Sequence, residues 1–174
     1  MKYLVKFFVV TFLLLVSTNV FAEQKIVVLD IKYVLNFSKA GKGAQDFLKK
    51  SFSNNQKKFS DIEKSLKKEE VDMLAQQTVL SKEEYTKKSD TLRKKVIDYQ
   101  SQRRAAIDKI AKQRAESRET LLKRIEPIVD AYIKENKISL VIDKKIWLGG
   151  SSEIDITNAI IEKLNKELPS LNLK

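Results

Sequence analysis

The sequence predicts an α+β protein that is mostly helical, with a small β head and a long antiparallel helical hairpin as its arm. Between Gly43 and Pro127 the chain runs for 83 residues without a glycine or a proline. A short, β-branched apolar run lies on either side, at 25–30 and 138–143. One straight helix of that length would exceed ~120 Å, several times the diameter of a small domain. The stretch therefore projects into solvent or folds back, and its faces are open to partners.

The first 22 residues are typical of a secretory signal peptide. Lys2 and Lys6 precede an apolar segment over 7–16, and the run 20–22 ends in the small residue expected at a cleavage site. We expect cleavage near Ala22 and export of residues 23–174. An uncleaved membrane anchor is the alternative, but the apolar segment is shorter than the ~20 residues that span a bilayer.

The composition excludes several classes of chemistry. The chain contains no cysteine and no histidine, which removes disulfides, thiolate zinc sites, cysteine nucleophiles and Ser-His-Asp triads. Asp30, Asp143 and Asp155 are carboxylates that invite a catalytic interpretation. Their places at strand ends and at a helix start are explained by turns and N-capping. We expect no enzyme, no cofactor and no metal site.

The elements of the head follow from short apolar runs at both ends of the chain. Residues 25–30 predict a buried strand and 31–37 a short helical turn. Gly41 and Gly43 allow a change of direction, so the long helix is expected to begin near Ala44. After the arm, 138–143 predicts a second strand, 146–148 a possible third, and 155–157 the start of a last helix that ends before Pro169.

Two features predict that the long helical stretch is a hairpin. Ser81 and Glu84 form a capping-box pattern, which starts a second helix near Lys82 and places the tip at about 76–81. Each half also carries an apolar seam with heptad spacing: Leu48, Phe52, Phe59, Ile62, Leu66 and Met73, then Leu92, Val96, Tyr99, Ala106 and Ile110. A single continuous helix is the alternative.

The predicted hairpin is loose, because polar residues interrupt its seam. Asn55, Glu69 and Arg103 occupy positions where apolar side chains are expected. Pro127 should kink or interrupt the returning helix where the arm meets the head. The predicted division is a signal peptide over 1–22, a head over 23–43 and 127–174, and a coiled-coil arm over 44–126.

Most of the positive charge lies on the arm, where residues 44–126 hold 21 basic and 14 acidic side chains. Such a field attracts acidic polypeptides and anionic lipid, although for each single residue a merely solvated helix face is the alternative. Export argues against nucleic acid as a partner. The predicted client- or lipid-binding residues of the basic face are Lys87, Lys88, Arg93, Lys94, Lys95, Arg103, Arg104, Lys109, Lys112 and Arg114.

The order of these elements resembles the Skp/OmpH family of periplasmic chaperones. The closest local matches are 25–30, 140–143 and 151–157. The resemblance implies a jellyfish-shaped homotrimer in the periplasm, with strands of three heads joined in a β-barrel and three hairpin arms around a cavity. It places self-association on head residues, which we assign to Ile26, Val27, Val28, Leu29, Leu140, Val141, Ile142 and Trp147.

The expected function is that of an ATP-independent holdase. It would bind unfolded outer-membrane β-barrel proteins between its basic arms and prevent their aggregation, with lipopolysaccharide or another anionic lipid as a further partner. A structural coiled-coil envelope protein and an anionic-lipid binding protein are the alternatives. Four aromatic residues either contact clients or form the seam: Phe47, Phe52, Phe59 and Tyr85.

Overall fold

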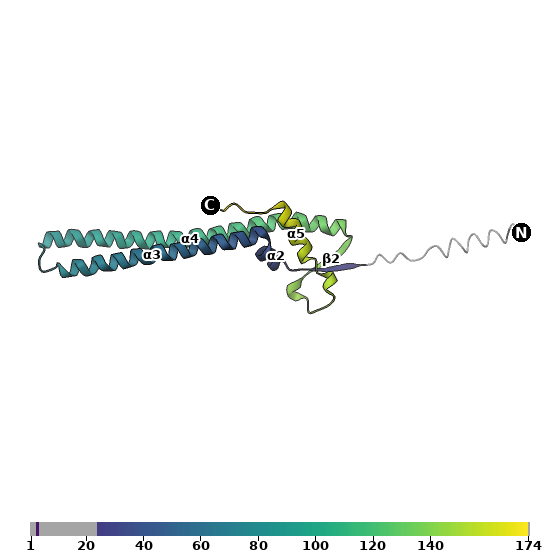
Figure 1. Ribbon diagram of the computed structural model, residues 1–174, viewed down its shortest axis with the longest axis horizontal. Coiled ribbons are helices and arrows are strands. Elements are labelled where there is room, and N and C mark those ends of the chain that lie inside the picture. Colours follow the sequence, from purple (N-terminus) through teal and green to yellow (C-terminus); the bar gives the residue numbers. More distant parts are fainter. Residues whose placement is uncertain (1–2, 4–23, 174) are drawn as a thin grey trace.

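A computed structural model of the chain describes residue 3 and residues 24–173, so nearly all of the predicted signal peptide lies outside the described residues. The described chain forms a small head and one long arm (Figure 1). Its mostly helical α+β fold agrees with the prediction. The elements in order are β1 (Lys25–Leu29), α2 (Ile31–Phe37), α3 (Lys39–Ala75), α4 (Lys82–Glu135), β2 (Ile138–Asp143) and α5 (Thr157–Glu167), with 3-10 turns at Lys144–Ile146 and Ser152–Ile154.

The head joins the two ends of the chain in a parallel pair of strands. β1 pairs with β2 in a register that sets Ile26 opposite Leu140 and Val28 opposite Ile142. On its other edge β1 forms a single bridge between Val28 and Asp155, whereas β2 has no further strand among the described residues. The arm is therefore an excursion between two neighbouring strands, and the strands hold its two ends together.

One face of this strand pair packs on helices α2, α4 and α5. The residues at its centre are apolar and almost fully buried, and Ile160 and Leu164 of α5 have no exposed surface. The whole cluster consists of Val27, Leu29, Val34, Leu35, Ala40, Leu121, Ile125, Ile128, Ile138, Ile156, Ile160 and Leu164. The core thus lies in the head and extends only to the first turns of the arm.

The long helix starts five residues before the predicted position, at Lys39. Ser38 ends α2 and caps α3, since its backbone is extended and its hydroxyl accepts a hydrogen bond of 3.2 Å from the Gly41 amide. Gly41 lies inside the helix, where a Cβ would come 1.9 Å from the Leu35 carbonyl oxygen. The glycine serves close helix packing rather than a turn, so this part of the prediction is wrong.

Two further features of the head differ from the expectation. α4 continues through Pro127 to Glu135, so Pro127 does not interrupt the helix. Residues 146–148 form no strand, because a 3-10 turn ends at Ile146 and the chain then runs extended through Trp147. The Trp147 ring lies over Gly150, where an added Cβ would be 3.3 Å from the indole. A bulky ring packed on a glycine shapes this segment into a loop.

A polar network closes that loop at its base. The Lys144 Nζ lies 2.6 Å from Asp155 Oδ2, and the Thr157 amide donates to Asp155 Oδ1 at 2.9 Å. Thr157 Oγ1 accepts from the Asp30 amide at 2.9 Å. The three segments that follow β1, follow β2 and precede α5 are tied together in this way. Asp30 and Asp155 thus have structural roles.

Among residues 24–173, no helix is both long and apolar enough to cross a membrane. The same residues contain no group of three or more acidic side chains arranged to hold a metal ion.

Candidate binding surface on the hairpin arm

The tip of the arm is a capped turn between two antiparallel helices. α3 ends at Ala75 and α4 begins at Lys82, so a single continuous helix is excluded. Ser81 Oγ accepts from the Glu84 amide at 3.3 Å, and Glu84 Oε2 accepts from the Ser81 amide at 3.1 Å. The hydrogen bond from the Ser81 hydroxyl, followed by that from its backbone N–H, lowers the pKa of the Glu84 carboxyl. The charged form of Glu84 therefore fixes the turn.

The seam between the helices is only partly dry. Phe59 and Ile110 are the only residues buried between 49 and 116, all of which the structure describes, and Phe59 meets Tyr99 edge-on with ring centroids 6.0 Å apart. Most other predicted seam residues are half-buried. Phe52 is 56% exposed and does not close the seam as predicted. Phe52 instead lines two open hollows on one flank of the hairpin.

An open groove follows one flank of the hairpin, from the head almost to the tip. Three consecutive hollows of about 690, 380 and 680 Å³ form it. Phe52 lines both the first and the second, and Glu63 and Tyr99 line both the second and the third. Each hollow therefore adjoins the next along the flank. We call this surface the arginine groove, after Arg93, Arg103, Arg114 and Arg118, which line it.

The groove combines exposed apolar residues with guanidinium groups. Phe52, Ile97 and Ile107 line it and are 56%, 59% and 54% exposed. Four of the six arginines of the arm line the groove, but only two of the fifteen lysines of the arm do, Lys49 and Lys67. Within the described residues, none of the four arginines has a side-chain ion pair or hydrogen bond. Their donors are available to a ligand.

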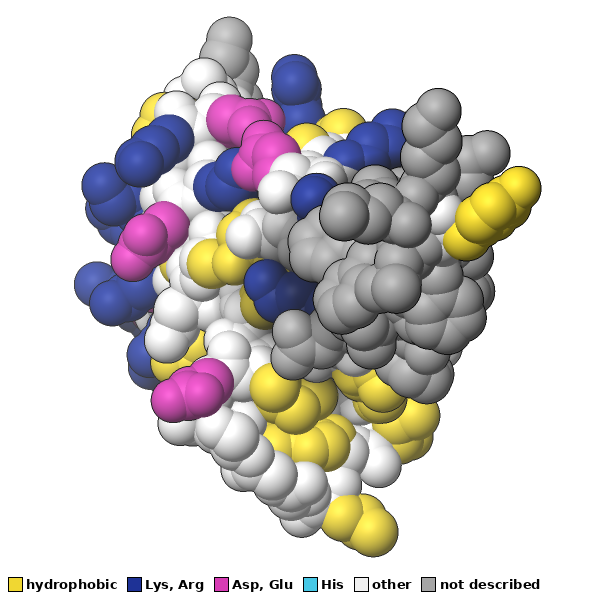
Figure 2. All heavy atoms as spheres, turned by 90° about the vertical axis from the view of Figure 1, so that its right-hand side faces the viewer, with side chains coloured by type: hydrophobic (Ala, Val, Ile, Leu, Met, Phe, Trp, Pro, Cys, Tyr) yellow, Lys and Arg dark blue, Asp and Glu magenta, His cyan; other side chains and the backbone are white. Residues whose placement is uncertain are grey.

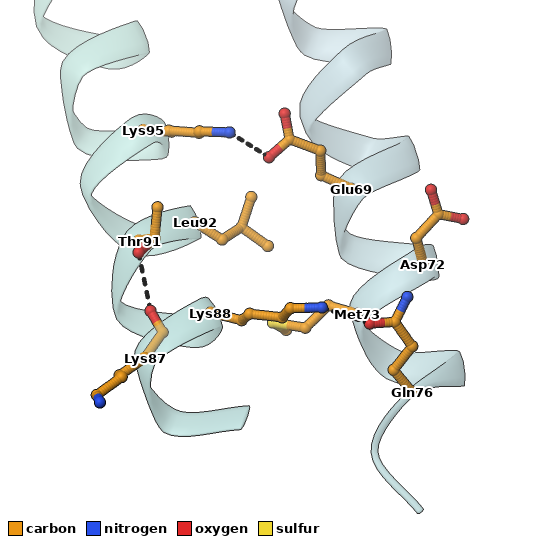
Figure 3. Close-up of a pocket in the computed structure, with 9 residues that line it drawn as sticks. All are labelled: Glu69, Asp72, Met73, Gln76, Lys87, Lys88, Thr91, Leu92 and Lys95. Carbon is orange, nitrogen blue, oxygen red and sulfur yellow. Dashed lines mark hydrogen bonds and ion pairs between the residues drawn. The ribbon is translucent and has the colours of Figure 1, made fainter. Parts of the chain in front are cut away.

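A smaller hollow of about 370 Å³ lies on the opposite flank near the tip (Figure 3). We call it the lysine groove, because Lys87, Lys88 and Lys95 line it and no arginine does. All three have partners in the chain. Lys95 Nζ lies 2.6 Å from Glu69 and Lys88 Nζ 2.5 Å from Gln76, both across the hairpin, and Lys87 pairs with Glu83 at 3.2 Å. Lys88 and Lys95 therefore join the two helices, whereas Lys87 is paired within α4.

The ten predicted basic-face residues do not form one surface. All ten are exposed, but Arg93, Arg103 and Arg114 line the arginine groove, whereas Lys87, Lys88 and Lys95 line the lysine groove. The charge is also uneven along the arm. Residues 49–68 and 93–115 hold 15 basic and 4 acidic side chains, but the end segment 69–92 holds 3 basic and 6 acidic ones. The basic charge therefore lies on the shaft of the arm, which we define as residues 49–68 and 93–115, rather than on the end segment 69–92.

Among the arginines and exposed apolar residues of the groove, three escaped the sequence-based prediction: Ile97, Ile107 and Arg118. The signal for part of the groove was present as a heptad repeat. Residues 93, 100, 107 and 114 line one rim at intervals of seven, and residues 49, 56, 63 and 70 line the other. Such positions flank the a and d seam of a two-helix coil. Ile107 interrupts an otherwise polar rim, which marks it as unusual.

The head residues predicted to self-associate separate into three groups by exposure. Val27, Val28 and Leu29 are at most 3% exposed and belong to the interior of a single head. Ile26 and Leu140, which face each other across the strand pair, are 41% and 51% exposed. Figure 2, viewed onto the head end, shows hydrophobic side chains gathered on its lower side. Val141, Ile142 and Trp147 are half-buried.

A small mixed head that carries one long two-helix arm, with an open groove along one flank, defines a head-and-hairpin architecture. Comparison with known proteins makes the assignment specific. The model of the family described as outer membrane protein (OmpH-like) matches residues 25–164, and the chain belongs to this family.

Two relatives illustrate the likeness. A Skp-like protein of Pseudomonas aeruginosa is 24% identical over 166 residues, which cover 95% of this chain and 99% of the relative. The crystal structure of an OmpH-like outer membrane chaperone from Caulobacter crescentus CB15 superposes with a TM-score of 0.80 at 14% identity, covering 87% of this chain and 89% of that one. The second likeness concerns the fold alone.

Proposed function

We propose that this protein is an ATP-independent holdase of the periplasm, which binds unfolded outer-membrane β-barrel proteins and keeps them from aggregating. The observation that carries the proposal is the arginine groove, with three exposed apolar side chains on a basic arm. Exposed apolar surface shields the apolar residues of an unfolded chain, while the charge of the shaft attracts acidic precursors over a longer range. The family and its relatives support this assignment.

The working form that we propose is a homotrimer, in which three arms surround a cavity. The apolar pair Ile26 and Leu140 and the unpaired edge of β2 support self-association of the heads. An open strand edge in a two-stranded sheet is a liability unless another chain covers it. Light scattering on a sizing column should give the mass of three mature chains, and a monomer would contradict the trimer.

The chaperone activity is tested by diluting a urea-unfolded β-barrel protein into buffer without ATP. A stoichiometric amount of the mature protein should suppress the rise in light scattering, and unchanged scattering would exclude the holdase function. The double variant Ile97→Ser with Ile107→Ser should suppress less. A matched control is Val71→Ser with Leu74→Ser, because these residues are 58% and 53% exposed but lie outside the groove.

Binding of anionic lipid is a second candidate, which the excess of basic residues on the shaft favours. Sedimentation with vesicles that contain anionic lipid should then be lost with rising salt. A purely structural coiled coil is less well supported, since its seam would be closed, whereas this hairpin is open at Phe52 and polar at Asn55 and Arg103.

A further inference from the structure

The choice between arginine and lysine along the arm points to how the groove recognises its ligand. A diffuse positive field needs only charge, and lysine supplies it as well as arginine. Yet the arginine groove takes four of six arginines and two of fifteen lysines, and the lysine groove takes no arginine. This division follows the two flanks of one hairpin, so the two kinds of cation lie on different surfaces.

Arginine and lysine differ in the contacts they make. The guanidinium group is planar, forms two parallel hydrogen bonds to a carboxylate and stacks on aromatic rings, whereas the ammonium group acts as a point charge. In the arginine groove Arg103 shares its hollow with Phe52, Phe59 and Tyr99. In the lysine groove the cations are engaged with Glu69, Gln76 and Glu83. The arginine groove thus presents unpaired guanidinium groups beside aromatic rings. The cations of the lysine groove instead have partners within the hairpin.

We propose that the arginine groove binds extended client segments that carry both apolar side chains and carboxylates, with the carboxylates held by Arg93, Arg103, Arg114 and Arg118. This inference rests on the proposed holdase function and names the part of the client that the arm recognises. To client binding, the lysines outside this groove contribute only the long-range field.

The dimensions of the groove fit such a segment. Arg93 and Arg114 are 21 residues apart on α4, which is ~31 Å of helix at ~1.5 Å per residue. An extended chain advances ~3.3 Å per residue, so about nine residues pass from one arginine to the other. A membrane-spanning β-strand has ~9–11 residues. Phe52, Ile107 and Ile97 are spaced along the same length and meet the apolar side chains of the segment.

The test replaces all four groove arginines by lysine, which preserves the net charge of the mature protein. Fluorescence anisotropy follows a labelled twelve-residue peptide that contains leucine, tyrosine and four aspartates, in ~0.3 M salt to screen the long-range field. The quadruple Arg→Lys variant should bind about tenfold more weakly, which corresponds to about 1.4 kcal/mol. The same peptide with asparagine in place of aspartate should not distinguish the variant from the wild type.

The matched control removes four charges outside the groove: Lys50→Gln, Lys57→Gln, Lys64→Gln and Lys68→Gln. These lysines are exposed and line neither groove. At this salt their loss should weaken peptide binding by less than about twofold. Equal binding by the Arg→Lys variant and the wild type would overturn the proposal, and so would an equal loss in the control.

Two further outcomes distinguish this proposal from lipid binding by the groove and from a failure of the holdase function. If the Arg→Lys variant retains peptide binding but loses anionic vesicles, the groove serves lipid and the proposal is wrong. If the wild type fails to suppress aggregation of the unfolded barrel protein, the holdase function itself fails, whatever the peptide shows. Suppression by the wild type together with unaltered peptide binding by the variant would overturn only the recognition by arginine.

Discussion

The head and the arm are both built from amphipathic helices, but the head buries their apolar faces and the arm leaves part of those faces exposed. In the head, twelve apolar residues form one buried cluster, and Ile160 and Leu164 have no exposed surface. In the arm, only Phe59 and Ile110 are buried between 49 and 116, and the seam is open along both flanks. A two-helix hairpin has no third element to cover its sides, so apolar side chains there stay available. The head therefore buries its apolar residues, and the arm leaves part of its apolar surface open.

The largest expected effect is on the core of the head. Leu164→Ala removes a fully buried side chain and should lower the free energy of unfolding by about 3 kcal/mol, through lost burial and the cavity left behind. Urea unfolding followed by circular dichroism measures it. The control Leu74→Ala, at a residue that is 53% exposed, should change stability by less than about 0.5 kcal/mol. Equal losses in both variants would abolish the contrast between head and arm.

The second prediction compares two phenylalanines of one helix. Phe59 is 6% exposed and packs on Tyr99, whereas Phe52 is 56% exposed. Phe59→Ala should cost about 2 kcal/mol, less than in a closed core because the seam is already partly wet. Phe52→Ala should lower the stability of the arm by under about 1 kcal/mol, but it should weaken client binding more than Phe59→Ala does. Hydrogen exchange of arm amides measures the stability, and a larger cost at Phe52 would contradict the assignment of its ring to the groove.

The hairpin was predictable from the sequence because its signals are local. A capping box and a heptad seam depend on neighbours a few residues away, and the structure has the turn at Ser81 where these patterns place it. The start of α3 was missed because Gly41 owes its presence to a contact with the Leu35 carbonyl in the preceding helix. From the sequence pattern alone, such a glycine indicates a turn.

The arginine groove was only partly predictable. The sequence identified Arg93, Arg103 and Arg114 as basic candidates but placed them on one face with Lys87, Lys88 and Lys95. Which flank a side chain lines depends on the rotation of each helix about the seam, and polar interruptions blur that seam. Phe52 shows the same limit, since its seam position is clear from the sequence but its exposure depends on how the two helices meet around it.

The third prediction concerns the tip, where one cap holds the turn. Ser81→Ala removes the hydroxyl that caps α4 and should cost about 1 kcal/mol of local helix stability. Faster hydrogen exchange should appear in the first turns of α4, while exchange in α5 stays unchanged. Ser89→Ala is a suitable control, since it lies within the helix rather than at its cap. Faster exchange in α5 would show that tip and head unfold together rather than separately.

The smallest effect is expected at the polar network of the head, and it depends on pH. Burial raises the pKa of the Asp155 carboxyl, but hydrogen bonds from Lys144 and Thr157 outweigh it and hold the pKa below its ordinary value of 3.8. A lowered pKa in the folded state stabilises the protein above the unfolded value, and this contribution is lost as pH falls through the folded one. Asp155→Asn should therefore be less stable than the wild type near pH 7 by under about 1 kcal/mol.

The pH profile distinguishes this ion pair from a merely packed side chain. The difference in unfolding free energy between the wild type and Asp155→Asn should be constant between about pH 5 and 7 and shrink below about pH 4. Thermal unfolding at each pH measures it, with Glu153→Gln as the control because Glu153 is exposed in the same loop. A difference that persists undiminished in acid would mean that shape rather than charge ties the loop after β2 to α5. The head would then resist acid through its apolar core alone, which sharpens its contrast with the arm, whose turn is fixed by the ionised Glu84.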